Sequence, residues 1–160
     1  MSKKFATSLL GVVCLLCSLG ASAQKLQNPY GLPVSLENAK KAAAAALTEA
    51  RKNNWNMAVA VVDPNGDLIY YEKMENTQLG SSNLAIDKAR SATRFKRPTK
   101  AFEDGLQSGG LRLLGVEGAV VVAGGVPIVM DGKIVGAIGV SGETSDNDNQ
   151  CATAGAAVLK

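Results

Sequence analysis

The stretch GAVVVAGGVPIVMDGKIVGAIGVSG, residues 118–142, decides the fold of this chain. Its two apolar runs meet at Asp131-Gly132, and an Asp-Gly pair between apolar runs is the strongest short signal for a β-hairpin, because both turn residues need a positive φ. We therefore predict two buried strands that turn back at this pair. Glycine weakens a strand unless a bulge, a bend or a close approach requires it. The stretch nevertheless holds seven, which makes the hairpin the first place to look for a binding site: Gly118, Gly124, Gly125, Gly132, Gly136, Gly139 and Gly142.

The N-terminal residues 1–23 have the pattern of a secretory signal peptide. Lys3 and Lys4 precede an apolar run, and Ala21-Ser22-Ala23 is an A-x-A cleavage site. The run is too short to span a bilayer, so we expect no stable membrane anchor after cleavage. The sequence thus predicts export to the periplasm or the extracellular space and a single mature domain over residues 24–160.

The composition of the mature chain excludes several functions. Removing Lys3 and Lys4 lowers the net charge from +3 to +1, which leaves no strong field to attract nucleic acid. Aromatic residues make up 4% of the chain, too few to favour a stacking platform for single strands. Cys151 is the one cysteine left after cleavage, and its apolar surroundings predict a buried, inert thiol.

The other elements follow from periodicity and caps. We expect helices at 36–52 (capped by Ser35), from Ser81 or Ser82 to 95, at 99–107, and from a capping box at Ser145-x-x-Asp148 to 159. Strands are expected at 57–62 and 68–73 around an Asn65-Gly66 turn, at 111–114, and in the hairpin. Because hairpins dominate, the prediction is an α+β domain whose mostly antiparallel five-stranded sheet has helices packed on it.

The residue types favour holding a ligand over transforming one. Histidine is absent, which removes the commonest general base near neutral pH and the commonest transition-metal ligand. A single mature cysteine excludes structural zinc sites. No metal site is expected, and the sequence identifies no catalytic residue.

Two candidate sites lie at the ends of the hairpin. The amides of Gly124-Gly125-Val126-Pro127 are suited to bind a carboxylate, although a bulge beside an edge-strand proline also explains them. Ser141-Gly142 leads into a predicted helix N-terminus that includes Asp146. The backbone amides there are suited to attract an anion, and the carboxylates are suited to bind a hard cation. Ordinary helix capping explains the second cluster as well.

A third candidate site is the basic cluster on and just after the predicted helix: Lys88, Arg90, Arg94, Lys96 and Arg97. Arg90 and Arg94 are four residues apart and share a helix face, so they are suited to clamp a propionate or phosphate. A solvated charged face is the alternative.

The order and spacing of these motifs resemble the GlcG/HbpS-like family, which includes haem-binding proteins and the C-terminal domain of PduO-type corrinoid adenosyltransferases. The resemblance covers the whole mature chain and rests on these motifs: Asp63-x-x-Gly66-x-Leu68, Met74, Ala85-x-x-Lys88-Ala89-x-x-Ala92, Arg97-Pro98-Thr99, Gly124-Gly125-x-Pro127-Ile128, Asp131-Gly132, Gly136-Ala137-x-Gly139-Val140-Ser141-Gly142 and Asp146.

The resemblance implies a five-stranded antiparallel sheet, homo-oligomers built from dimers, and haem binding in some members. A haem-degrading role is attributed to the family, and a secreted member serves a sensor kinase. Histidine ligation of haem iron is impossible in this chain, so Met74 or a tyrosine is the candidate iron ligand.

We therefore expect an exported small-ligand-binding protein with a sensing, storage or accessory role. Haem or another tetrapyrrole is the leading ligand, with Arg90 and Arg94 meeting its propionates. One alternative is an enzyme or binder of a small organic acid, in a pocket that Lys88, Asp146 and the hairpin amides frame at an oligomer interface. The other alternative is an oligomeric scaffold without a ligand.

Overall fold

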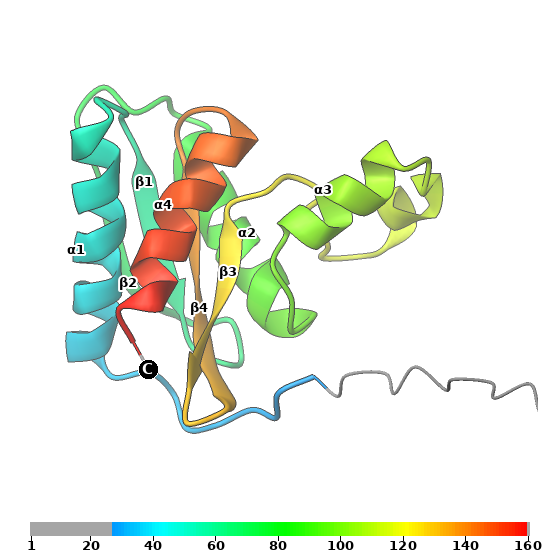
Figure 1. Ribbon diagram of the computed structural model, residues 1–160, viewed down its shortest axis with the longest axis horizontal. Coiled ribbons are helices and arrows are strands. Elements are labelled where there is room, and N and C mark those ends of the chain that lie inside the picture. The colour runs from blue at the N-terminus through cyan, green and yellow to red at the C-terminus, as the bar shows by residue number, and fades with distance from the viewer. Residues whose placement is uncertain (1–26, 160) are drawn as a thin grey trace, which may run out of the picture.

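The computed structural model describes residues 27–159, so the predicted signal peptide lies outside the described residues (Figure 1). The elements, in chain order, are α1 (Leu36–Lys52), β1 (Ala58–Val62), β2 (Leu68–Lys73), α2 (Ser81–Arg94), α3 (Lys100–Gln107), the 3₁₀ helix η1 (Leu111–Gly115), β3 (Gly125–Met130), β4 (Lys133–Ser141) and α4 (Ser145–Ala157).

The described chain forms an α+β fold around one antiparallel sheet with the strand order β2-β1-β4-β3. The sheet has four strands and not the predicted five, because residues 111–114 belong to η1. This run is only four residues long, and Leu111 and Leu114 are exposed rather than packed in a sheet. A short apolar run does not distinguish a strand from other structure by its pattern alone.

The hairpin between β3 and β4 is confirmed at the predicted turn. Asp131 and Gly132 have φ of 49° and 71°, and Met130 pairs with Lys133 across them. The first strand is shorter than the apolar run that predicted it. It begins at Gly125, because Gly124 has a φ of 122° that interrupts extended backbone.

Helices cover both faces of the sheet. Along β1, Val59 and Val61 pack into the main core with α1 and α4. The alternate residues Ala58, Ala60 and Val62 instead belong to clusters that include alanines of α2. Strand side chains alternate between faces, so α2 lies on the face opposite α1 and α4 (Figure 1). This arrangement explains why all five residues of β1 are buried.

The segment of α3 and η1 projects from this layered body (Figure 1). Gly105 in α3 lies against Leu113 of η1, so the two short helices pack on each other. Phe102 anchors the base of the projection, where it is buried and contacts the ring of Phe95 edge-on. The rest of the projection leaves several apolar side chains exposed, among them Leu111 and Leu114.

Two of the predicted helix starts differ in outcome. Ser35 caps α1 as predicted, since its hydroxyl accepts a hydrogen bond from the Asn38 amide at 3.2 Å. The predicted cap of α2 by Ser81 or Ser82 is wrong, because Gly80 occupies the cap position without a side-chain bond. The buried hydroxyl of Ser81 instead accepts a hydrogen bond from Ser141 at the end of β4.

The closest approach between α2 and the sheet depends on Gly139 in β4. A Cβ there would overlap the carbonyl oxygen of Ala85 and come within 2.6 Å of the Ala89 amide nitrogen, both backbone atoms of α2. We expect Gly139→Ala to lower the free energy of unfolding by about 3 kcal/mol or more, because the helix would have to move off the sheet. Urea unfolding of the purified protein measures this change.

Gly115→Ala is the matched control, because a Cβ there meets nothing within 4 Å. It should change the free energy of unfolding by no more than about 0.5 kcal/mol. Equal effects of the two substitutions would show that α2 does not press on Gly139.

Candidate functional site

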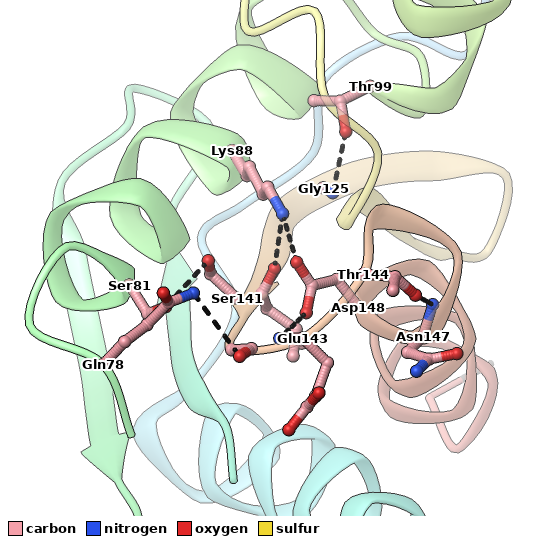
Figure 2. A network of polar contacts seen from close by, with 12 residues as sticks. Gln78, Ser81, Lys88, Thr99, Gly125, Ser141, Glu143, Thr144, Asn147 and Asp148 are labelled. Carbon is pink, nitrogen blue, oxygen red and sulfur yellow. Dashed lines mark hydrogen bonds and ion pairs between the residues drawn. The ribbon is translucent and has the colours of Figure 1, made fainter. Parts of the chain in front are cut away.

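The centre of the candidate site is a lysine that is fully buried. Lys88 projects from α2 toward the ends of β4 and α4, and none of its side chain is exposed (Figure 2). Its Nζ donates to Asp148 Oδ2 at 2.7 Å and to the Val140 carbonyl oxygen at 3.1 Å. Lys88, which the sequence suggested as a ligand-binding residue, is therefore enclosed by the protein and paired internally.

Local sequence explains why both charges are buried. Lys88 lies three residues after Ala85 and four before Ala92, and both alanines are buried on the face of α2 that meets the sheet. Asp148 occupies the equivalent place on α4, on one stripe with the buried residues Cys151, Ala152 and Gly155. A charged residue on an otherwise apolar stripe is the signal that could have identified this pair from the sequence.

The predicted capping box at Ser145-x-x-Asp148 is wrong. Thr144 is the N-cap of α4, and its hydroxyl accepts from the Asn147 amide at 3.4 Å. Asp148 lies one turn inside the helix and uses both carboxylate oxygens. Oδ1 accepts from the Glu143 amide at 3.0 Å, while Oδ2 meets Lys88 (Figure 2). The acidic residue therefore joins the loop before α4 to α2.

The glycine pair before β3 covers the buried lysine. A Cβ on Gly124 would lie 2.9 Å from the Lys88 Nζ, and a Cβ on Gly125 would overlap the Lys88 carbonyl oxygen. The Gly125 amide donates to the Thr99 hydroxyl at 2.9 Å, and its carbonyl accepts from the Thr99 amide at 2.9 Å. Close packing explains both glycines, and the Gly125 amide already has a partner within the protein.

Burial dominates the electrostatics of the pair. It lowers the pKa of Lys88 and raises the pKa of Asp148, and in each case the partner's opposite charge acts against this shift. Glu103 of α3 adds negative potential that also raises the pKa of Lys88. Each charge thus depends on the other, since removing one leaves an uncompensated ion in the interior.

Arg90 and Arg94 are brought together on the C-terminal half of α2. They line a surface cavity of about 280 Å³ with Asp87 and with Gly118, Ala119 and Val120. Arg90 Nε donates to the Gly66 carbonyl at 3.1 Å, and its Nη1 lies 3.9 Å from an Asp87 carboxylate oxygen. Arg94 is exposed and has no carboxylate within 4 Å among residues 27–159. The predicted pair is thus available to an anion, with Asp87 as a competing charge at the rim.

Met74 lies away from the two arginines. Its amide donates to the Met57 carbonyl just before β1 begins, and its side chain packs against the main core. Arg90 instead reaches Gly66 in the turn after β1 ends. Within one copy of the chain the structure does not bring Met74 and the arginines together.

The remaining predicted residues are dispersed. Ser141 is buried against Ser81, and Gly142 packs on Asn56 and Met57 while its carbonyl accepts from Gln78 at 3.4 Å (Figure 2). The Asp146 side chain is 81% exposed and lies 3.8 Å from Lys100. Since Lys88 is enclosed and Asp146 points outward, the two do not frame a pocket. Pro127 lies in β3, at the edge of the sheet.

The cysteine prediction is confirmed. Cys151 is a free and fully buried thiol, and burial raises its pKa to about 12. Within the described range no three Asp, Glu or Cys side chains gather where they could hold a metal ion. No helix of residues 27–159 is both long and apolar enough to cross a bilayer.

Comparison with known proteins identifies the family. The family model described as "Haem degrading protein HbpS-like" matches residues 34–157. Protein GlcG of Escherichia coli K12 is 38% identical over 108 residues, which are 68% of this chain and 81% of GlcG. The chain therefore belongs to the HbpS-like family.

Solved structures support the same assignment. A double mutant of HbpS from Streptomyces reticuli is 31% identical with a TM-score of 0.74, covering 97% of this chain and 99% of that one. The PduOC:heme complex is 27% identical with a TM-score of 0.72, covering 81% of this chain and 96% of that one.

The buried ion pair gives a sharp mutational test. Lys88→Met removes the cation and leaves Asp148 uncompensated, so we expect the free energy of unfolding to fall by about 3–5 kcal/mol. Lys88→Met with Asp148→Asn should recover most of that loss, because the amide oxygen of asparagine still accepts from Glu143 while no charge remains buried. Chemical unfolding of the wild type, both single variants and the double variant measures the coupling. A double variant less stable than Lys88→Met would contradict the mutual dependence of the two charges.

Proposed function

We propose that this member of the HbpS-like family is an exported protein that binds haem or a related tetrapyrrole in a sensing, storage or accessory role. The observation that carries the proposal is the likeness to the PduOC:heme complex, which extends over most of both chains. The family description, which refers to haem, points the same way.

The chain's own residues fit the carboxylate end of a haem. Arg90 and Arg94 line one cavity, and guanidinium groups pair with carboxylates through two parallel hydrogen bonds. Arg94 also lines a neighbouring cavity of about 330 Å³ with Tyr30 and Pro64. These shallow cavities are small for a tetrapyrrole, so the ligand would remain partly exposed on one copy. A second copy of the chain would cover it, which agrees with the predicted homo-oligomer.

A haem bound to this chain would need an iron ligand other than histidine, the common one. The chain has no histidine, so iron would take another donor, such as a methionine thioether, a tyrosine oxygen or water. Because Met74 lies away from the arginines within one copy, it is suited to this role only across an interface between copies. Bound haem would supply redox and ligand-binding chemistry, while the arginines would hold and orient it.

Binding is better supported than catalysis on a small organic acid. That alternative required Lys88 and Asp146 to frame a pocket, but Lys88 is enclosed and Asp146 faces outward. Arg90 and Arg94, by contrast, already line a surface cavity together, so neither side chain would have to move out of the interior to meet a ligand.

Haemin titration tests the proposal. Saturating wild-type protein should shift the Soret band of haemin away from its free position. Arg94→Ala should raise the dissociation constant for haemin by about tenfold to a hundredfold, the usual effect of losing one charge-assisted hydrogen bond. Arg112→Ala is the control, since Arg112 is an exposed arginine of η1 that does not line the cavity. An unshifted Soret band, or equal weakening by the two substitutions, would contradict the proposal.

Export is tested separately. When the full chain is expressed in a Gram-negative bacterium, we expect a periplasmic product whose N-terminal sequence begins at Gln24, because Ala21-Ser22-Ala23 directs cleavage. Ala23→Asp should block cleavage and leave the longer chain. Recovery of the uncleaved wild-type chain from the cytosol would refute export.

A further inference from the structure

Two adjoining cavities run along the outer edge of the sheet, beside β3. Their volumes are about 350 and 420 Å³, and both are lined by Pro98 and Val126. Ile134 and Lys96 contribute to the first, and Lys100 to the second. Volumes of roughly 300–1,000 Å³ with mostly apolar walls are typical of small-molecule sites. We call these two cavities the β3 groove.

The β3 edge is protected against pairing with another strand. Pro127, in the middle of β3, has no amide hydrogen to donate outward, and the strand register shifts between Ile128 and Val129. A proline and a bulge are two devices by which edge strands avoid adding a further strand. The β3 groove is therefore better suited to a small molecule than to an extended peptide or a second copy.

Lys96 is held at the β3 groove by an unusual backbone conformation. Its φ is 54°, and the bonds from its amide to Thr93 and from the Arg97 amide to Ala92 end α2. Glycine is the usual residue at such a left-handed helix end, because a side chain there is strained. Strain retained at one residue points to a role for its side chain.

The charge of Lys96 has no carboxylate partner among the described residues. Its Nζ lies 4.1 Å from the centroid of the Tyr30 ring, a cation–π contact. Lys100, at the other cavity, is 3.0 Å from an Asp104 oxygen and 3.8 Å from an Asp146 oxygen. Of the two lysines that line the β3 groove, Lys96 is thus the one free to meet an anion.

We propose that the β3 groove binds an apolar molecule with one carboxylate, and that Lys96 pairs with that carboxylate while Pro98, Val126 and Ile134 contact the apolar body. The β3 groove is separate from the cavity of Arg90 and Arg94, so the inference does not depend on haem binding there. The Tyr30 ring holds the lysine in place for this contact.

Fluorescence titration with 1-pyrenebutyrate and its neutral analogue 1-pyrenebutanol tests the proposal. Wild-type protein should bind the butyrate about tenfold more tightly than the alcohol, the effect of one partly desolvated ion pair. Lys96→Gly should weaken butyrate binding to the level of the alcohol and leave the alcohol unchanged. Lys96→Arg should keep the preference for the anion.

Thermal unfolding separates this result from loss of structure. Lys96→Gly should raise the melting temperature by a few degrees, because glycine relieves the left-handed strain. Lys40→Ala, at an exposed lysine of α1, is the control and should leave binding of both probes unchanged.

Three results would overturn the proposal. The first is equal binding of both probes by the wild type. The second is butyrate binding that survives Lys96→Gly. The third is a homo-oligomer that Val126→Glu converts to a monomer, which would show that a second copy fills the β3 groove.

Discussion

The buried ion pair between Lys88 and Asp148 is the constraint on which the rest of this structure depends. It connects α2 on one face of the sheet, the end of β4 within the sheet, and the start of α4 on the other face. A buried charge without its partner costs several kcal/mol, so these elements must be in place together. Shorter side chains could not make the connection, since Lys88 reaches across from one helix layer toward the other.

The glycines of the hairpin region follow from that constraint. Gly124 and Gly125 contact Lys88 directly, and Gly139 lets α2 approach β4 closely enough to bury the lysine. A glycine-rich stretch is often interpreted as room for a ligand. Here the close neighbours of these three glycines are the backbone of α2 and the ammonium group of Lys88. The glycines therefore serve the packing of the fold. Ligands have access to other surfaces, at the far end of α2 and along β3.

Local signals predicted most of the fold. The Ser35 cap, the buried strand at 57–62 and the Asp131-Gly132 turn each depend on neighbours in the sequence, and the structure confirms them. The predicted strand at 111–114 failed because four apolar residues carry no period that separates strand from helix. The burial of Lys88 was missed for a different reason. The sequence shows a lysine on an alanine stripe, but whether that stripe meets solvent or an aspartate depends on a contact sixty residues away.

The difference between local signals and long-range contacts also explains which ligand-binding candidates the sequence could identify. Arg90 and Arg94 share a face because they are four residues apart, a local relation that the sequence states directly. The sequence placed Lys96 in the basic cluster, but its left-handed backbone could not be predicted, since a positive φ at a lysine has no counterpart in composition or spacing. Of the basic residues between 88 and 96, the most buried one stabilises the fold, and those toward the C-terminal end of α2 face the cavities. Burial thus separates Lys88, which organises the interior, from the basic residues that lie at the surface cavities.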